Sequence, residues 1–538
     1  MIEVSLSHPN ARITPLNGFP KEIVLKPETE FPYEQRHLQL RNDQVLRYAL
    51  SLRSRIIGAC RNVLKDLGFL EIETPLLFKS TSEGAREFII PTRRRGYAFA
   101  LPQSPQQFKQ LLMASGIEKY FQLAKCFRDE DLRADRQPEF LQVSRYSEVL
   151  QRKPANGARA QLDIEQAFSN SEKICDCVEA IVTQAFKGVL DVDLPRQFAR
   201  MTYLEAMSSY GSDKPDLRLP ILPFKKMGHI IPVDLVRMIS SLSDPIVEAM
   251  VVPLQCSATE SRLLLRDFLD SSEGQTFTRN PDGGPGIFIY ESSKPLQGLA
   301  AFGFEAVENL EGDLDLEDGF VIVLQARKKV QHSGGSTFLG DLRNRLAEAA
   351  IRKGFLDEPS WLHFEPVWIT DFPLFSPANI SEPGQGGHAG FASTHHPFTS
   401  PKTSDDVDLL LTEPTKVIGE HYDLVINGEE IGGGSQRVHQ AAMQEFIFRK
   451  ILKMDDAKVQ EFSHLLEALR AGCPPHAGIA LGMDRLVAMM ASSKFKRKLS
   501  MRDVIAFPKS GKGDDPMVKS PGLITSSALE TYHLRLRE

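Results

Sequence analysis

A stretch that mixes arginines with carboxylates offers the clearest chemistry in this 538-residue chain. It runs from Phe127 to Phe140 and reads FRDEDLRADRQPEF, with apolar sequence on both sides. Guanidinium groups and carboxylates together suit a site that binds phosphate oxygens and a divalent metal. A solvated charged surface explains most runs of mixed charge. The apolar flanks favour instead a hairpin that carries its charges into a cleft.

Two further segments combine a short strand-like run with the residues of a turn or a helix start. Gly68 to Leu77 reads GFLEIETPLL, a strand-like run stopped by Pro75. Gly478 to Met490 reads GIALGMDRLVAMM, in which glycines and a single arginine, Arg485, precede an apolar helix. With Phe127 to Phe140 between them, these segments resemble motifs 1, 2 and 3 of the class II aminoacyl-tRNA synthetases, in the order of that family. They are most similar to the aspartyl members of bacterial type.

The resemblance implies an α+β fold, an antiparallel sheet flanked by helices, with an inserted α+β domain between motifs 2 and 3. It implies an enzyme that uses ATP and Mg²⁺ to convert L-aspartate to aspartyl-adenylate and then transfers the aspartyl group to tRNA(Asp). It also implies a homodimer, whose interface would include the helix expected over Asn42 to Leu67 and the strand after it. An ordinary buried helix–strand pair fits the apolar spacing of that helix equally well.

Several residues match positions that the family uses for ATP. Arg128 matches the arginine that grips the α-phosphate and the substrate carboxylate, for which a guanidinium fork suits better than a lysine. Arg485 matches a residue that stacks on adenine or holds the γ-phosphate; outside this context, an ion pair with Asp484 would explain it. The resemblance assigns catalysis to Arg128, Glu430 and Arg485. It assigns ATP binding to Arg128, Asp129, Glu130, Gln137, Phe140, Glu430, Gly482, Met483, Asp484 and Arg485.

The segment from Tyr422 to Arg437, YDLVINGEEIGGGSQR, alternates polar and apolar residues and carries three adjacent glycines. By the resemblance, Asp423 and Glu430 match the family's Mg²⁺ positions. A perfectly regular strand would place them on opposite faces, because they are seven residues apart. A bulge, or a turn at Asn427–Gly428, would bring both carboxylates to one metal.

The resemblance also predicts an aspartate pocket. Arg437 matches the residue that reads the side-chain carboxylate of aspartate through a bidentate pair. Asparagine would leave one guanidinium donor facing an NH₂ group, and such a mismatch costs about 10⁴-fold in a site built for specific hydrogen bonds. Gln103 to Gln106 match the segment with which the family binds aspartate, and Lys109 follows on the same element. The residues assigned to aspartate binding are Glu83, Gln103, Ser104, Pro105, Gln106, Arg128, Asp163, His395 and Arg437.

The resemblance divides the chain into four parts. Residues 1–33 are expected to be a linker that follows the family's anticodon-binding barrel, since five strands do not fit in so few residues. Residues 34–232 and 366–538 are expected to form the catalytic domain. Residues 233–365 have Gly/Pro turns, an acidic linker at Glu305 to Asp318 and a β-rich run, and are expected to form an inserted GAD-like domain.

Residues Val143 to Gln161 interrupt the motif 2 strand. The family's strand reads like FTQLDIE, whereas here VSRYSEVLQRKPANGARAQ separates FLQ from LDIEQAF. We interpret these nineteen residues as an unspliced intron, because a β-ladder resists such a split and every valine codon begins with GT. A surface loop inserted at a bulge is the alternative. Since Asp163 follows the insertion, its place in the pocket depends on which interpretation holds. We predict that the chain as written activates aspartate weakly and charges tRNA poorly.

Composition limits the partners and the compartment. With a net charge of −6, the chain would contact tRNA through local patches, and Arg93 to Arg95 and Lys494 to Lys498 are candidates. Solvated loops explain both patches equally well. The six cysteines form no CxxC pair, so we expect free thiols and no zinc site. No apolar run is long enough to span a membrane. An intron would place a bacterial-type enzyme in a eukaryote, so we expect the mitochondrial matrix, with the bacterial cytoplasm as the alternative.

Two other functions stay open. A related amide-forming enzyme would make asparagine from aspartyl-adenylate and ammonia without tRNA, although such relatives lack the inserted domain. A non-catalytic tRNA-binding paralogue would have lost part of the site, whereas Arg128, Glu430, Arg437 and Arg485 are all present here.

Overall fold

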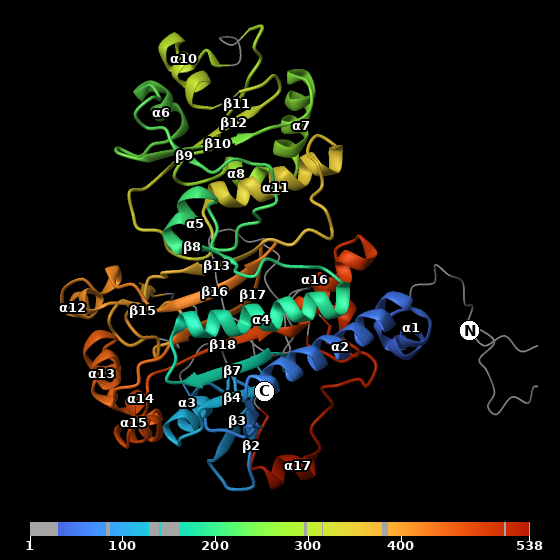
Figure 1. Ribbon diagram of the computed structural model, residues 1–538, viewed down its shortest axis with the longest axis vertical. Helices are drawn as coiled ribbons and strands as arrows, with labels where there is room; N and C mark the ends of the chain where they lie inside the picture. The colour runs from blue at the N-terminus through green and yellow to red at the C-terminus, as the bar shows by residue number, and fades with distance from the viewer. Residues whose placement is uncertain are drawn as a thin grey trace, which may run out of the picture.

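The fold was analysed in a computed structural model of the chain (Figure 1). The structure describes residues 31–81, 87–127, 139–140, 161–294, 299–314, 316–378, 386–510 and 513–536. Five residues predicted to bind ATP or aspartate lie outside these ranges: Glu83, Arg128, Asp129, Glu130 and Gln137.

The main body is built on an eight-stranded sheet in the order β1-β4-β7-β18-β17-β16-β13-β8. The six central strands pair antiparallel, as predicted, whereas the edge pairs β1–β4 and β13–β8 are parallel. Strands from the first and the last third of the sequence meet at the centre, because β7 lies beside β18. The bounds are β1 Leu70–Glu71, β4 Lys119–Ala124, β7 Gln161–Ala167, β8 Ala199–Thr202, β13 Pro366–Thr370, β16 His421–Ile426, β17 Glu429–Gln436 and β18 His476–Gly482.

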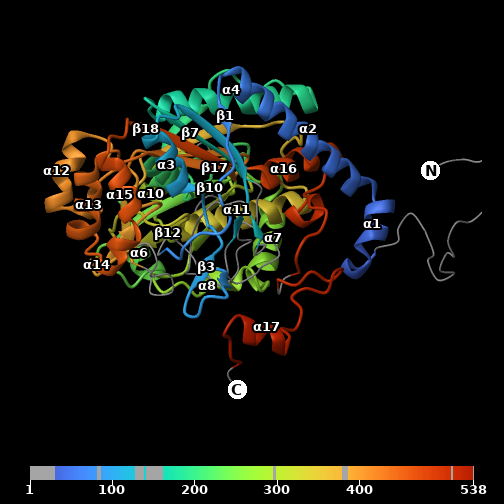
Figure 2. The same ribbon diagram turned by 90° about the horizontal axis from the view of Figure 1, so that it is seen from below.

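Three helices cover one face of this sheet: α2 (Gln44–Asp66), α4 (Ser171–Leu190) and α16 (Met483–Phe495). Figure 2 shows α2 and α4 together on that side. Helix α2 confirms the helix predicted from Asn42 to Leu67. The carboxylate of Asp43 accepts hydrogen bonds from the first-turn amides, and Gly68, with φ +81°, follows its end. Its buried residues recur every three or four positions and face the core: Leu46, Ala49, Leu52, Ile56, Cys60 and Leu64.

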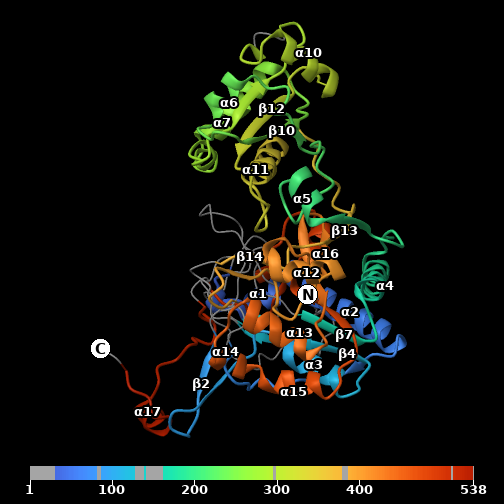
Figure 3. The same ribbon diagram turned by 90° about the vertical axis from the view of Figure 1, so that its left-hand side faces the viewer.

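A second body stands apart from the main sheet (Figure 3). Its four-stranded antiparallel sheet has the order β11-β12-β10-β9, with β9 Lys225–Lys226, β10 Ile246–Val252, β11 Gly286–Ile289 and β12 Val321–Arg327. Helices α7 (Ala258–Asp270) and α11 (Phe338–Lys353) contribute to the core on one face, and α6 (Val233–Ile239) and α10 (Phe304–Asp313) to the core on the other. The predicted domain boundary at residue 233 stays a prediction, and β9 precedes it.

The acidic linker predicted at Glu305 to Asp318 was wrong over most of its length, because helix α10 occupies it. Val307, Leu310 and Leu314 are buried at helical spacing against the second sheet. This apolar stripe outweighs the acidic composition of the segment, because burial rather than charge decides whether a short helix forms.

The remaining elements surround the main sheet or join the two bodies. A group of short helices packs around a third core beside the sheet. Helix α17 lies at the end of an extended tail in Figure 3. No helix within the described ranges is long and apolar enough to cross a lipid bilayer. The bounds are η1 Tyr33–Gln35, α1 Arg36–Asn42, β2 Ile89–Pro91, β3 Ala98–Ala100, α3 Gln106–Ala114, α5 Tyr203–Ser209, α8 Gln275–Thr278, β14 Phe375–Pro377, β15 Phe391–Ser393, α12 Ser404–Thr412, η3 Pro414–Lys416, α13 Ala441–Phe446, η4 Ile447–Ile451, α14 Asp456–Glu461, α15 Ser463–Arg470, η5 Met501–Val504 and α17 Ser526–Thr531.

Strand register locates the extra residues of the interrupted strand. Strand β5 (Cys126–Phe127) pairs with β6 (Glu139–Phe140), and Cys126 lies opposite Phe140. In the main sheet, Ala124 lies opposite Gln161. An antiparallel ladder advances equally on both strands. From Cys126 back to Ala124 is two steps, whereas from Phe140 forward to Gln161 is twenty-one, so nineteen residues fall outside one continuous register. That excess equals the length of the segment from Val143 to Gln161.

Candidate active site

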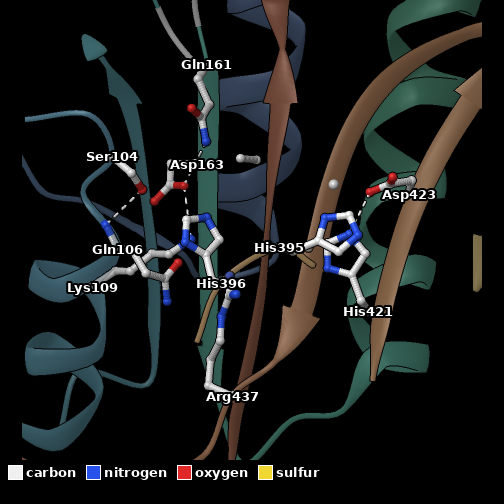
Figure 4. Close-up of a pocket in the computed structure, with 13 residues that line it drawn as sticks. Ser104, Gln106, Lys109, Gln161, Asp163, His395, His396, His421, Asp423 and Arg437 are labelled. Atoms are coloured by element: carbon white, nitrogen blue, oxygen red, sulfur yellow. Dashed lines mark hydrogen bonds and ion pairs between the residues drawn. The ribbon is translucent and has the colours of Figure 1, made fainter. Parts of the chain in front are cut away.

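A polar pocket lies over the central strands of the main sheet (Figure 4). Its walls come from the start of helix α3, from strands β7, β16, β17 and β18, and from the segment after β15. Among the predicted aspartate-binding residues, Ser104, Gln106, Asp163, His395 and Arg437 line it, together with Lys109. The other lining residues are Gln161, His396, His421, Asp423, Gly433, Gly434 and Ala480.

Strand β7 supplies two carboxylates to this side of the sheet. Asp163 and Glu165 are two residues apart, so they point to the same face, whereas Leu162 and Ile164 point into the core beneath helices α2 and α4. The neighbouring strand leaves room for these side chains by having glycine at position 478. A Cβ atom there would come within 1.9 Å of Glu165 Oε2.

A buried network joins four charged side chains, of which Figure 4 draws Lys109, Asp163 and Arg437. Lys109 Nζ lies 3.1 Å from Asp163 Oδ1 and 2.9 Å from Glu165 Oε2. Arg437 Nε donates to Glu165 Oε1 over 3.2 Å, and Arg437 Nη1 donates to Ser435 Oγ over 2.5 Å. All four charged side chains are at most 4% exposed. Buried charges at this depth are stable only when paired, so the network holds each head group in a defined place.

The two carboxylates of β7 differ in acidity. Burial raises the pKa of Asp163 to about 6, against the lowering effect of Lys109. Burial also acts on Glu165, but Lys109 and Arg437 together outweigh it and lower the pKa of that carboxyl. Glu165 therefore stays ionised between its two cations. Asp163 Oδ2 has no hydrogen-bond partner within the described ranges.

Histidines form the opposite wall of the pocket. The rings of His395 and His421 stack with centroids 3.4 Å apart and planes 18° apart. His421 Nε2 lies 2.9 Å from Asp423 Oδ1, and the edge-on ring of Phe372 contacts both imidazoles. Figure 4 shows the stacked rings beside Asp423, on the other side of the pocket from Lys109 and Asp163.

Asp423 and Glu430 lie on one hairpin and face the same side. The turn at Asn427 and Gly428, both with positive φ, joins β16 to β17, and Glu430 lies opposite Val425. Because Val425 follows Asp423 by two residues, Asp423, Val425 and Glu430 share a face. A bulge between Leu424 and Val425 then places Gly433 opposite Asp423.

A lysine from a distant loop enters this acidic hairpin. Lys214 Nζ lies 3.2 Å from Glu430 Oε2 and 3.3 Å from Asp213 Oδ2. Burial raises the pKa of Asp423 to about 7 and that of Asp213 to about 6, and Lys214 opposes both shifts. Burial lowers the pKa of Lys214, but Asp213 and Glu430 outweigh it, so the pKa is raised and the ammonium stays charged.

The hairpin offers two carboxylates that suit a magnesium ion bound together with phosphate oxygens. No group of three or more metal-binding side chains was found among the described residues. Mg²⁺ binds through one or two carboxylates together with substrate phosphates and water, and does not require such a group. Asp423 and Glu430 provide two oxygen-bearing side chains on one face, which is the donor set that this mode needs.

Strand β18 leads directly into helix α16, where Gly482 is the N-cap residue. Asp484 forms an ion pair with Arg53 of helix α2. Arg485 is 4% exposed, and its Nη1 has no hydrogen-bond partner within the described ranges. A buried guanidinium with an unused donor suits an anionic ligand such as a phosphate.

Comparison with known proteins assigns the chain. The family of tRNA synthetases class II (D, K and N) matches residues 28–156 and 159–511. The chain is a class II tRNA synthetase. It is 38% identical over 519 residues to the mitochondrial aspartate–tRNA ligase of Schizosaccharomyces pombe, covering 95% of this chain and 77% of that protein.

Two further relatives are also mitochondrial aspartate–tRNA ligases. The mitochondrial aspartate–tRNA ligase of Saccharomyces cerevisiae is 39% identical over 548 residues, covering 94% of this synthetase and 77% of the relative. The mouse mitochondrial enzyme is 38% identical over 521 residues, covering 96% and 73%. Membership of the class confirms the predicted fold, and ATP is the substrate common to its members.

Not every predicted residue reaches the pocket of this synthetase. Gln103 faces a neighbouring depression that Lys79, Thr81 and Glu87 also line. Pro105 is the N-cap residue of α3. Phe140 pairs through its backbone with Cys126.

Sequence reasoning missed several residues of the synthetase site. Glu165 follows Asp163 by two positions, so strand alternation could have placed it in the pocket. His421 precedes Tyr422 in the same strand and could have been found in the same way. No local sequence pattern identifies Asp213 and Lys214 as site residues, because they lie near Glu430 only through tertiary contacts.

Proposed function

We propose that this class II synthetase is an aspartate–tRNA ligase, which activates L-aspartate with ATP and transfers the aspartyl group to tRNA(Asp). The observation that carries the proposal is the buried pair of cations, Lys109 and Arg437, held on either side of Glu165. With Asp163 the four charges of this network sum to zero, as do the side-chain carboxylate and α-ammonium of aspartate: the two cations suit the first, and Asp163 suits the second. The names of the three relatives agree with this assignment.

Recognition of the side chain would come from Arg437 and Lys109. Glu165 accepts from Nε and Ser435 accepts from Nη1, which orients the guanidinium plane and leaves the Nη2 donors for the ligand. Asparagine would offer an amide NH₂ to these donors and would leave a buried charge uncompensated. Such a mismatch costs about 10⁴-fold in a site built for specific hydrogen bonds.

The α-ammonium of aspartate would be held by Asp163. Its Oδ2 is buried without a hydrogen-bond partner among the described residues, while Oδ1 is occupied by Lys109. Glu83 is the second proposed ammonium contact, by resemblance to the family. Together these contacts would orient the α-carboxylate toward ATP.

ATP would be held by Arg485, Arg128 and the ring of Phe140, the last two by resemblance. Asp423 and Glu430 would hold Mg²⁺ with the phosphates. When bound there, the metal would supply a Lewis acid that offsets phosphate charge. The α-carboxylate oxygen of aspartate attacks the α-phosphorus, and pyrophosphate leaves. The arginines stabilise the charge that grows on the phosphate oxygens.

The second step transfers the aspartyl group. A ribose hydroxyl of the terminal tRNA adenosine attacks the carbonyl carbon of the adenylate, the hydroxyl proton is lost, and AMP leaves. Lys109 and Arg437 keep the aspartyl side chain fixed during this step, so the carbonyl presents a constant geometry to the nucleic acid.

We place the enzyme in the mitochondrial matrix and as a homodimer. The three relatives are mitochondrial by name, which supports the organelle. The dimer rests on resemblance in the segment from α2 to Pro75. In this chain, Leu70, Leu76 and Leu77, in and just after that segment, are 55%, 42% and 50% exposed, which suits a surface covered by a second subunit.

Product analysis tests the proposal against the amide-forming alternative. The purified chain is incubated with ATP, Mg²⁺, ¹⁴C-aspartate and ammonium, with and without tRNA(Asp). We expect aspartyl-tRNA only when tRNA is present. Free asparagine formed without tRNA would overturn the proposal in favour of the amide-forming enzyme. Binding of tRNA with neither product would favour a non-catalytic paralogue.

A further inference from the structure

The loop over residues 211–218 carries a lysine from the junction of the two bodies to the hairpin of Asp423 and Glu430. The backbone of the loop is fixed by residues at the base of the second body. Asp213 N donates to Gly335 O over 3.1 Å, and Thr337 N donates to Gly211 O over 2.8 Å. Ser212 and Ser336 form a backbone bridge. The position of Lys214 is therefore set from outside the main sheet.

Further contacts anchor the same loop on both sides. Asp216 makes an ion pair with Arg218 at 2.7 Å, and its backbone oxygen accepts from Arg343 Nη2 of helix α11 over 3.3 Å. A Cβ atom at Gly428, in the turn of the β16–β17 hairpin, would come within 3.0 Å of the Asp216 Cβ. The loop thus packs on both the second body and the turn that precedes Glu430.

Lys214 compensates negative charge at the hairpin. Asp213, Asp423 and Glu430 are 8%, 4% and 1% exposed, so water compensates little of their charge. The ammonium of Lys214 contacts two of the three carboxylates. The lysine thus offsets part of the negative charge of these carboxylates. Without it, more negative charge would face the place where ATP must also bring its phosphates.

We propose that Lys214 is a positioning residue that shares Glu430 with the divalent cation and weakens metal binding in the absence of ATP. This inference rests on the proposed roles of Asp423 and Glu430. The ion pair with Lys214 orients the Glu430 carboxylate and occupies one of the two carboxylate oxygens. Metal alone must compete with the ammonium, whereas metal that arrives with ATP brings phosphate ligands that complete its coordination. The loop thereby favours metal–nucleotide over bare metal.

The test compares Lys214→Met with the wild-type full-length chain in two assays. Mn²⁺ binding without ATP is followed by electron paramagnetic resonance. Michaelis constants are measured by pyrophosphate exchange. Removing the opposing cation should strengthen Mn²⁺ binding about 10-fold to 100-fold, since a charge at this range acts through a low effective dielectric. The KM for ATP should rise and the KM for aspartate should stay unchanged. A merely structural lysine would not strengthen metal binding when removed.

Two matched variants serve as controls. Lys328→Met removes an exposed lysine paired with Asp282 in the second body, and should leave both assays unchanged. In Lys214→Met with Glu430→Gln, the gain in Mn²⁺ affinity should disappear, because the shared carboxylate is gone. If Lys214→Met does not fold, Lys214→Met with Asp213→Asn removes the lysine together with one of its partners, and should still bind Mn²⁺ more tightly than the wild type.

The outcomes separate this inference from the proposed function. Unchanged or weaker Mn²⁺ binding in the folded lysine variants would overturn the role of Lys214. If Glu430→Gln alone leaves wild-type Mn²⁺ binding unaltered, the proposed metal role of Glu430 fails, and the inference fails with it. Absence of aspartate-dependent pyrophosphate exchange in the wild type would instead contradict the proposal that aspartate is the substrate.

Discussion

Arg437 Nε donates to Glu165 Oε1 over 3.2 Å, and both side chains are buried. The other oxygen of Glu165 lies 2.9 Å from Lys109 Nζ. One carboxylate thus holds both cations that we assign to aspartate recognition. In the proposed mechanism its role is to orient these two groups rather than to contact the substrate.

We expect Glu165→Gln to raise the KM for aspartate by about 10-fold to 100-fold, since loss of one charge from a buried pair costs about 2 kcal/mol or more. The KM for ATP should change little. Pyrophosphate exchange at varied aspartate and ATP measures both constants. Glu248→Gln is the matched control, because Glu248 is a buried strand glutamate that pairs with Arg327 in the second body. Equal effects of the two variants on aspartate KM would contradict the role of Glu165.

The glycine at position 478 leaves room for the carboxylate of Glu165. An alanine Cβ there would lie 1.9 Å from Glu165 Oε2 and 2.3 Å from Ile164 O, so strand β7 would have to shift. We expect Gly478→Ala to lower the free energy of unfolding by about 1–3 kcal/mol, as overpacking does, and to raise aspartate KM. Chemical denaturation and exchange kinetics measure the two effects.

The control for this change is Gly188→Ala. Gly188 lies inside helix α4, and a Cβ atom added there would have nothing within 4 Å. Alanine there should stabilise the fold by about 0.5–1 kcal/mol, because glycine is a poor helix residue. A well-folded Gly478→Ala variant with wild-type aspartate KM would show that the glycine is not needed for the pocket.

Acid should weaken aspartate binding before it unfolds the protein. Burial raises the pKa of Asp163 from 3.8 to about 6, so its ammonium-binding charge is lost as pH falls through 6. The folded pKa exceeds the unfolded one, so this group stabilises the fold at low pH and loses that contribution as pH rises through 6. Aspartate KM should therefore rise between about pH 7 and pH 5 without a loss of stability from this residue.

The measurement is aspartate KM against pH in the wild type and in Asp163→Asn. The variant has no carboxyl to titrate, so its KM should be high and nearly flat over this range. A wild-type KM that stays constant across the same range would contradict the proposed ammonium contact.

Deleting Val143 to Gln161 should improve the enzyme. The strand registers on the two sides of the segment become continuous when nineteen residues are removed. Closing a loop of this length costs about 1–3 kcal/mol, so the deletion should raise the free energy of unfolding by a similar amount. Activity should rise because the motif 2 strand would then anchor its arginine directly. Lower stability and lower exchange activity in the deleted protein would favour a genuine loop. Sequencing of the mature transcript tests the intron separately, since a transcript that encodes the segment excludes it.

The resemblance carried by the three motifs predicted the main sheet and about half of the pocket residues. Asp163, His395 and Arg437 came from resemblance, and the structure brings them together although they are far apart in sequence. Lys214 could not be predicted, because its approach to Glu430 depends on contacts between the loop at 211–218 and residues 335–343. Helix α10 was predictable from the spacing of Val307, Leu310 and Leu314, but its acidic composition favoured a linker instead.

The most direct test of the account is pyrophosphate exchange driven by single amino acids, in the wild type and in Arg437→Met. With the wild type, L-aspartate should support exchange, and L-asparagine should be poorer by about 10⁴-fold in kcat/KM. Arg437→Met should lose the preference for aspartate while the chain remains folded. Exchange that is equally fast with asparagine, or an Arg437→Met variant that keeps its preference for aspartate, would contradict the account.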